Sequence, residues 1–208
     1  MPNAGFVHLH VHSAYSLLQG SMKIARLAEL AKADHQPALA LTDTDNMFGA
    51  LEFSDKMASS GIQPIIGCAL AVDFGDQDPN ARNALAAAPS RIVLLAMREA
   101  GYRSLMKLNS RAFLETPVNE LPHIKLSWLE GESANLIALT GGPGGPVSLA
   151  LTADQGALAI TRTERLMELF GDRLYVELQR HGLESERRVE AALIDIAYAK
   201  SLPLVATN

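Results

Sequence analysis

Short apolar runs alternate along the chain with longer stretches in which apolar residues recur at helical spacing. Between residues 22 and 33, for example, Ile24, Leu27, Ala28 and Ala31 are three or four positions apart and fall on one face of a helix. The apolar runs are rich in Ile, Val and Leu, which is typical of buried strands. The pattern predicts strands at residues 6–10, 38–42, 64–73, 91–96, 135–140, 174–179 and 202–206. It predicts helices at residues 22–33, 47–59, 101–114 and 184–200, and two more between the glycine-rich stretch 141–146 and Phe170.

Strands separated by helices predict an α/β fold with a mostly parallel sheet and right-handed crossovers. This many repeats favours a distorted seven-stranded (βα)7 barrel of the TIM-like kind, with an open doubly wound sheet as the alternative. Residues 75–90 and 115–125 carry prolines and are expected to be loops. No linker divides the chain, so we expect one domain over residues 1–208. No helix follows the last predicted strand, so we expect a piece of a longer protein with its last helix truncated.

The composition is that of a globular protein, with 48% hydrophobic and 20% charged residues. The formal net charge of −5 argues against strong binding to nucleic acid, because phosphate-binding surfaces need an excess of Lys and Arg. The single cysteine, Cys68, excludes an internal disulfide and fits a reducing compartment. The first residues show no signal-peptide pattern, and no apolar run approaches the roughly 18 residues of a membrane span. We therefore expect a cytoplasmic location without membrane contact.

Three histidines alternate with apolar residues at the end of the first predicted strand: His8, His10 and His12. On a regular strand their side chains point to the same side, so two or more imidazoles can reach one metal ion. Active sites of barrels lie at this end of the strands. Near the end of the sixth predicted strand, Glu177 and His181 are further candidate ligands. A polar cluster at the sheet edge explains the same residues without any metal, and both interpretations stay open.

Polar residues also follow the second predicted strand. Asp43 is a candidate site residue, whereas Asp45 or Asn46 is expected to cap the next helix through a side-chain oxygen. The glycine-rich stretch 141–146 lacks the Lys-Ser/Thr of a phosphate-binding loop and does not match Gly-x-Gly-x-x-Gly. It is therefore expected to be a turn.

Several segments, in this order, resemble the amino-terminal region of bacterial DNA polymerase III alpha subunits. They are residues 6–20 (FVHLHVHSAYSLLQG), 37–53 (PALALTDTDNMFGALEF), 62–67 (IQPIIG), 101–110 (GYRSLMKLNS), 136–141 (LIALTG), 175–182 (YVELQRHG) and 202–208 (LPLVATN). The resemblance covers nearly the whole chain, and its motifs are specific in combination. That region is the PHP (polymerase and histidinol phosphatase) domain, so the resemblance implies a distorted seven-stranded barrel.

Metal-binding members of the family place their ligands at the carboxyl ends of the strands. The resemblance implies that His10 and His12 are retained as vestigial ligands, with Asp43 as a further candidate. It implies that other ligand positions now carry poor donors or none: Gln19, Thr44, Ala69, Arg91 and Gly142. The last Asp-x-His of the family would fall beyond Asn208.

These replacements predict a degenerate metal site and no resident cofactor. Zinc or manganese needs three or more donors held in geometry, and two imidazoles alone bind weakly. Arg91 would add a permanent positive charge where cations bind in the family. If Arg91 points into this site, we expect it to pair with Asp43 or Glu177, because an unpaired buried guanidinium is costly.

The resemblance implies a non-catalytic structural and partner-docking module that serves DNA replication. The parent protein would be a DNA-directed DNA polymerase, and its catalytic aspartates lie in later domains, so this chain is expected to lack polymerase activity. Its expected partners are the rest of the alpha subunit and the proofreading exonuclease (epsilon) subunit, with DNA reached only through the full polymerase. The alternative is an active metal-dependent phosphoesterase or 3′–5′ exonuclease that uses zinc or manganese. An amidohydrolase-like barrel is disfavoured, because the residues after the fifth strand, 139–142, include no histidine.

Overall fold

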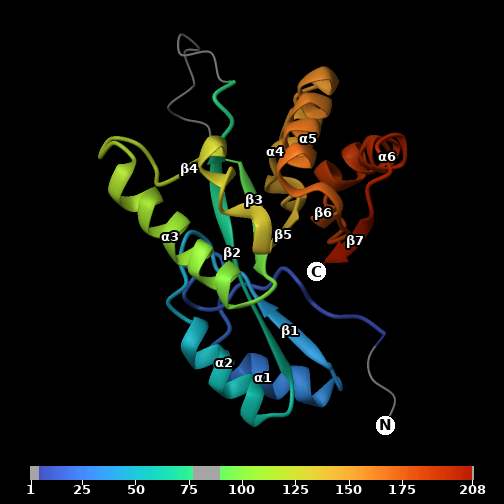
Figure 1. Cartoon of the computed structure of the whole chain (residues 1–208). Coiled ribbons are helices and arrows are strands. Elements are labelled where there is room, and N and C mark those ends of the chain that lie inside the picture. Colours follow the sequence, from blue (N-terminus) through green and yellow to red (C-terminus); the bar gives the residue numbers. More distant parts are fainter. Residues whose placement is uncertain (1–4, 77–89, 208) are drawn as a thin grey trace.

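The computed structural model describes residues 5–76 and 90–207 and shows a curled sheet flanked by helices (Figure 1). The strands are β1 (Ala38–Leu41), β2 (Gln63–Asp73), β3 (Arg91–Ala96), β4 (Ile124–Lys125), β5 (Leu136–Leu139), β6 (Leu174–Gln179) and β7 (Leu204–Thr207). The α-helices are α1 (Ile24–Ala33), α2 (Ala50–Ser59), α3 (Glu99–Glu115), α4 (Pro146–Thr152), α5 (Gly156–Phe170) and α6 (Glu184–Ala199). The loop expected at residues 75–90 lies outside the described residues except at its two ends.

The described strands form one seven-stranded sheet in the order β1-β2-β3-β5-β6-β7, with β4 paired to β2. The predicted α/β class is confirmed, and the curled seven-stranded sheet forms a half-barrel that is consistent with the predicted distorted TIM-like barrel. Four of the six strand pairs are parallel, as predicted for a mostly parallel sheet, but β3 is antiparallel to both of its neighbours. A parallel return needs a crossover connection, and the described part of the β2–β3 connection contains no helix.

The first predicted strand, residues 6–10, is an extended segment outside the regular ladder. It lies along β1 through two backbone hydrogen bonds, from Ala40 N to His8 O and from Thr42 N to Val11 O. The donors are two residues apart and the acceptors three, so the segment carries one extra residue and its alternation breaks, as at a β-bulge. The seventh strand is instead β4, in a stretch that was expected to be a loop.

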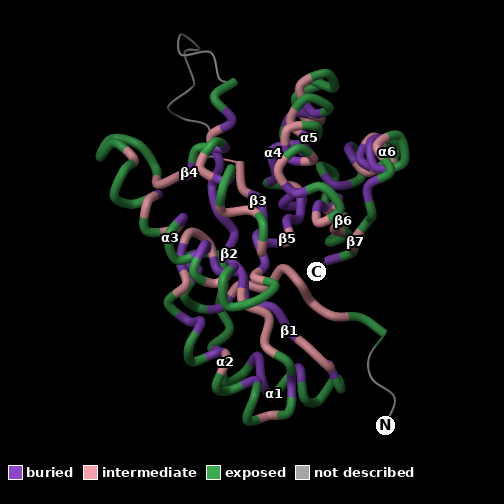
Figure 2. The backbone as a smooth tube through the Cα atoms, viewed as in Figure 1, coloured by how far each residue is buried: buried purple, intermediate pink, exposed green. Residues whose placement is uncertain are grey.

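The buried residues form three groups: one inside the curled sheet, and two between the outer face of the sheet and the helices. Small and branched side chains of the strands fill the interior: Ala40, Ala69, Val93, Leu95 and Leu139. The alternate residues of β2, β3, β5 and β6 pack outward against α3, α4, α5 and α6, and α1 and α2 cover β1. Figure 2 shows this as buried strands between helices whose outer faces are exposed. Burial on both faces explains why the strands read as continuous apolar runs.

The helices occur where they were predicted, with one exception in how a helix begins. The helix expected from residue 47 starts at Ala50, and its N-cap is Gly49 without a side-chain hydrogen bond. The expectation that Asp45 or Asn46 caps α2 is therefore wrong, and Asn46 instead accepts from Phe48 N in the preceding turn. The helix ends at Ser59, as predicted. Gly61, just beyond the C-cap, has a φ of +74°, which is typical of a glycine that ends a helix. None of the helices in the described ranges is long and apolar enough to cross a membrane.

Candidate functional site at the rim of the sheet

The predicted site residues lie at one rim of the sheet, where the ends of the parallel strands meet the start of the antiparallel β3. A chain of contacts links residues from the amino-terminal segment, the loop after β1, and the ends of β5, β6 and β7. Its central members are His10, His12, Thr44, Gly142, Glu177, Gln179 and Thr207. His8 is not part of this chain, because its ring packs against Phe6, with the two ring centroids 4.9 Å apart.

Asp43 is almost completely buried, with 1% of its surface exposed. Its Oδ1 accepts hydrogen bonds from Ser13 N at 2.7 Å and from Ser16 Oγ at 2.5 Å. Its Oδ2 accepts from Ser13 Oγ at 2.7 Å. These three donors satisfy the carboxylate and fix the loop after the first histidines onto the end of β1. We call Asp43, Ser13 and Ser16 the Asp43 cluster.

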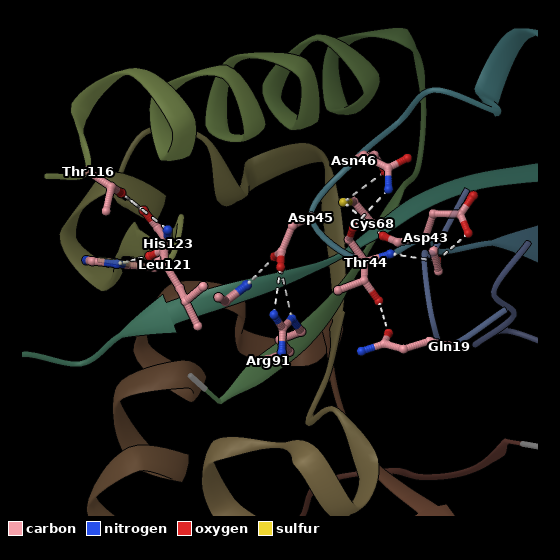
Figure 3. A network of polar contacts seen from close by, with 12 residues as sticks. Gln19, Asp43, Thr44, Asp45, Asn46, Cys68, Arg91, Thr116, Leu121 and His123 are labelled. Atoms are coloured by element: carbon pink, nitrogen blue, oxygen red, sulfur yellow. Dashed lines mark hydrogen bonds and ion pairs between the residues drawn. The ribbon is translucent and has the colours of Figure 1, made fainter. Parts of the chain in front are cut away.

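Gln19 and Thr44, two of the positions that the resemblance singles out, bond to each other (Figure 3). The hydroxyl of Thr44 donates to the side-chain oxygen of Gln19 and lies 3.4 Å from Nδ1 of His12. The rings of His12 and His10 are neighbours, with centroids 5.2 Å apart. Burial lowers the pKa of His12 from its ordinary value, and the nearby His10 acts in the same direction. The neutral imidazole is therefore favoured at this position.

Glu177 is the centre of a second polar cluster and is 1% exposed. Its Oε1 lies 2.7 Å from His10 Nδ1, and it also accepts from Gln179 Nε2 at 2.9 Å and from Thr207 Oγ1. Its Oε2 accepts from Gly141 N at 3.0 Å. Burial acts to raise the pKa of Glu177, but the hydrogen bond from His10, its charge, and the bonds from Thr207 and Gln179 outweigh it and hold the pKa below its usual range. We call these five residues the Glu177 cluster.

The side chain of Gln179 fills the space next to Gly142. A Cβ atom built on Gly142 would lie 2.7 Å from Cδ of Gln179 and 2.9 Å from its amide nitrogen and oxygen. Gly142 also has a φ of +57°, in the left-handed region that favours glycine. Any side chain at position 142 would therefore collide with Gln179 as it stands. The expectation of a turn at residues 141–146 agrees with the positive φ of Gly141 and Gly142.

Arg91 begins β3 and pairs with Asp45, so the expectation that it pairs with Asp43 or Glu177 is wrong (Figure 3). Its Nε and one terminal nitrogen lie 3.1 Å and 2.7 Å from Oδ2 of Asp45. The other oxygen of Asp45 accepts from Ala71 N at 3.1 Å. Asp45 has a φ of +53°, and this turn directs its carboxylate to β2 and β3 rather than to α2. The guanidinium is held at the rim as a half-buried ion pair.

Three further residues, Ala69, Cys68 and His181, lie outside the Asp43 and Glu177 clusters. Ala69 lines the sheet interior, and the buried thiol of Cys68 donates to the backbone oxygens of Asp43 and Asn46 at 3.3 and 3.4 Å. Burial raises the pKa of that thiol well above its usual range. His181 lies 2.8 Å from Glu186 at the start of α6 and does not join the Glu177 cluster. Within residues 5–76 and 90–207, no three His, Cys, Asp or Glu side chains form a group that could hold a metal ion.

Sequence reasoning missed five members of the two clusters: Ser13, Ser16, Gly141, Gln179 and Thr207. A signal for Gln179 was present, because residues 177 and 179 lie on the same side of a strand. Thr207 ends a neighbouring strand, so its position at the same rim was also predictable once the strand order was known. Ser13 and Ser16 lie in a loop whose path no periodicity predicts.

Comparison with known proteins gives one family and a consistent set of relatives. A family model described as PHP domain matches residues 8–181. The chain is 44% identical over 206 residues to the DNA polymerase III subunit alpha of Caulobacter vibrioides, covering 98% of this chain and 18% of the relative. It is 38% identical over 209 residues to the same subunit of Treponema pallidum, covering 100% of this chain and 18% of the relative. The corresponding Thermus aquaticus subunit is 37% identical over 206 residues, which cover 98% of this chain and 17% of the relative. The chain therefore spans less than a fifth of the length of these curated relatives.

Solved structures share the fold at low sequence identity. A candidate metal-dependent phosphoesterase from Bifidobacterium adolescentis superposes with a TM-score of 0.54 at 14% identity, covering 100% of this chain and 88% of its own. An amidohydrolase from Chromobacterium violaceum, with bound sulfate and no metal, has a TM-score of 0.54 at 18% identity. The superposition covers 97% of this chain and 86% of the amidohydrolase chain. These similarities show the fold alone.

Proposed function

The chain belongs to the PHP domain family, and on that premise we propose that it is the amino-terminal domain of a bacterial DNA polymerase III alpha subunit. We propose that it serves DNA replication in the cytoplasm as a non-catalytic structural and partner-docking module. The observation that carries the proposal is the identity to alpha subunits over nearly the whole chain. Polymerisation would belong to later domains of the full protein, so this chain alone is expected not to extend primers.

The chemistry of the rim supports a lost metal site. Asp43 is occupied by serine donors, and the Nδ1 of His10 is occupied by Glu177. Ala69 and Gly142 have no donor atoms, and Arg91 holds a positive charge at the rim against Asp45. His10 and His12 alone therefore supply fewer ligand atoms than the three or more that zinc or manganese needs. We therefore propose that no resident metal serves this domain.

Exposed apolar side chains support the docking role. Leu17 and Leu18 are 83% and 107% exposed, and Phe48 and Leu51 are each 75% exposed. The loop that carries the two leucines is tied to the turn before α2 by a hydrogen bond from Asn46 Nδ2 to Tyr15 O. Several large apolar side chains exposed on the segments on either side of this bond are the kind of surface that a protein partner covers. We propose that the rest of the alpha subunit covers it, that the epsilon exonuclease is a further partner, and that DNA is reached only through the full polymerase.

A metal-binding measurement tests the proposal directly. The purified chain is equilibrated with Zn²⁺ or Mn²⁺, dialysed, and analysed for bound elements beside a His10→Ala variant. We expect substoichiometric metal in both, with no difference between them. One or more tightly held ions per chain, lost in His10→Ala, would overturn the proposed loss of the metal site and favour the alternative of an active phosphoesterase or 3′–5′ exonuclease.

Activity assays separate the two functions further. Hydrolysis of p-nitrophenyl phosphate and shortening of a 5′-labelled primer are expected to stay at the background of a no-protein control with either metal. A Gln19→Asp/Thr44→His double variant restores two oxygen or nitrogen donors beside His12 and is expected to bind Zn²⁺ more tightly than the natural chain. Equal zinc binding by both chains would contradict the view that missing donors limit the site.

A further inference from the structure

The turn at residues 16–19 presents two leucines to solvent. Leu17 and Leu18 are 83% and 107% exposed, and the turn closes with a hydrogen bond from Gln19 N to Ser16 O at 3.0 Å. Leu18, the third residue of the turn, has a φ of +66°, which glycine and asparagine adopt far more readily. Leucine is therefore a poor choice for the isolated domain, both for the backbone and for the exposed side chain. An outlier of this kind points to a function.

Hydrogen bonds of the Asp43 cluster hold this turn in one shape. Ser16 Oγ donates to Asp43 at 2.5 Å, and the same hydroxyl oxygen accepts from Thr44 N at 3.0 Å. Gly20, directly after the turn, lies so close to Ser13 that a Cβ built on it would be 1.9 Å from the Ser13 carbonyl oxygen. A surface group whose shape is fixed in advance loses little conformational entropy on binding. The turn is thus preformed for a complementary apolar pocket.

Tyr15 connects this turn to further exposed apolar side chains at the start of α2. Its ring lies against Gly49, where a built Cβ would be 3.0 Å from ring carbon Cδ2. Its hydroxyl donates to Oε2 of Glu52 at 3.3 Å. Phe48 and Leu51 adjoin these two residues in the sequence, and each is 75% exposed. The turn and the start of α2 therefore flank the same tyrosine and form one surface.

The chemistry and size of this surface indicate its partner. Residues 14–22 and 46–51 contain no charged side chain. Charged residues are depleted at the core of protein interfaces, whereas a nucleic-acid partner requires Lys and Arg, so the surface suits an apolar protein partner. So small a group of side chains falls short of the roughly 20 to 30 residues that each of two separate proteins contributes to an interface. Within one chain a smaller contact suffices, because the covalent linkage supplies a high effective concentration.

We propose that the turn of Leu17 and Leu18 is the anchor on which a later domain of the same alpha-subunit chain docks. This inference rests on the proposed function and names the partner and the contact residues of its docking role. The match covers 18% of the Caulobacter vibrioides subunit, so more than four-fifths of that relative lies outside the match. A chain of that length contains further domains, and one of them would supply the apolar pocket.

The test is hydrogen exchange measured by mass spectrometry, which compares the 208-residue chain with the full-length polypeptide that contains it. We expect exchange at residues 14–20 and 46–52 to be about tenfold or more slower in the full-length protein, because a docked domain shields these amides. Leu17→Ser/Leu18→Asn should abolish the difference. Asparagine tolerates the left-handed φ, so the turn keeps its shape.

Leu114→Ser/Val118→Asn is the matched control. These side chains are 82% and 106% exposed, at the end of α3 and in the loop after it, and the control should leave the slow exchange intact. Both double variants of the 208-residue chain should unfold at the temperature of the natural chain, because the replaced side chains are exposed. Lost protection then reflects lost docking and not a failure to fold.

Four results would overturn the proposal. They are equal exchange in the short and full-length chains, protection that survives Leu17→Ser/Leu18→Asn, protection that appears only when the epsilon exonuclease is added, and protection that rises with the concentration of the 208-residue chain. The last two identify a separate protein or a second copy as the occupant. Primer extension by the same full-length preparation keeps the two proposals apart. If it extends primers without protection of the turn, only this inference fails, and if it does not extend primers, the proposed function fails.

Discussion

Two buried carboxylates at the same rim are held in different ways. Asp43 accepts from two serines that lie 27 and 30 residues away in the chain, and all three donors are uncharged groups. Glu177 joins parts of the chain that are far apart: His10 is 167 residues before it and Thr207 is 30 residues after it. The Asp43 cluster therefore fixes a loop onto one strand, whereas the Glu177 cluster ties the amino-terminal segment to β6 and β7 across the open side of the sheet.

The difference matters because the sheet is not closed by strand pairing. Within the described residues, β7 pairs only with β6, and β1 pairs only with β2. Side-chain hydrogen bonds around Glu177 take over where a backbone ladder is absent. The hydrogen bonds of the Glu177 cluster therefore stabilise the fold at this rim.

The largest expected effect is that of Glu177→Ala. Removal of the carboxylate leaves His10, Gln179, Thr207 and the amide of Gly141 without their common acceptor, and we expect the free energy of unfolding to fall by about 3 to 5 kcal/mol. Urea unfolding followed by circular dichroism measures this. Glu168→Ala, an exposed glutamate on α5, serves as the control and should change stability by less than about 0.5 kcal/mol. Equal losses in the two variants would show that Glu177 does not join the chain ends.

Asp43→Asn should destabilise less, because its effect stays local. An asparagine keeps one acceptor but turns an NH₂ group toward the serines, so we expect a loss of about 2 kcal/mol. Hydrogen exchange should speed up at residues 13–16 and remain unchanged in β6 and β7. Asp195→Asn, on the exposed side of α6, is the matched control. Faster exchange in β6 and β7 would mean that the two clusters are coupled and would break the comparison.

Gly142→Ala tests the contact between the turn after β5 and Gln179. The added Cβ would collide with the Gln179 side chain, and the alanine would have to adopt a positive φ. We therefore expect the free energy of unfolding to fall by about 1 to 2 kcal/mol. A second substitution, Gln179→Ser, in the Gly142→Ala chain should recover part of the lost stability, because the shorter serine side chain leaves room for the alanine Cβ. Gly144→Ala is the control, since a Cβ there has nothing within 4 Å. Additive effects of the two substitutions in a double-mutant cycle would contradict the contact.

The sequence allowed the elements to be predicted, because strands and helices follow from local periodicity. The direction of β3 and the existence of β4 were not predictable in this way. β4 has two residues, Ile124 and Lys125, too few for any pattern, and the direction of β3 depends on a connection with no periodic signal. The extra residue between His8 and Val11 likewise leaves no mark in the spacing of apolar positions.

For the candidate site, the sequence indicated which end of the strands several of the polar residues lie at, but not which residues they contact. His10, Asp43 and Glu177 follow or end strands, and such positions meet at one rim. The pairing of Arg91 with Asp45 depends on the left-handed φ of Asp45, which a non-glycine residue adopts only in particular turns. The contact between His10 and Glu177 spans 167 residues, and a single sequence carries no record of it.

The smallest expected effect is a difference in acid sensitivity, and it sharpens the comparison because it isolates the charge of Glu177. The pKa of Glu177 is lower in the folded chain than its ordinary value of 4.5, since the bonds and charge of His10 and the bonds from Thr207 and Gln179 outweigh its burial. A lowered folded pKa contributes stability that is present above the unfolded pKa and is lost as the pH falls through the folded pKa. The natural chain should therefore exceed Glu177→Gln in unfolding free energy at neutral pH, and this gap should narrow below about pH 4.5. Thermal unfolding of both chains across the acid range measures it, and a gap of constant size down to the lowest pH would show that the shape of the side chain, and not its charge, holds the Glu177 cluster together.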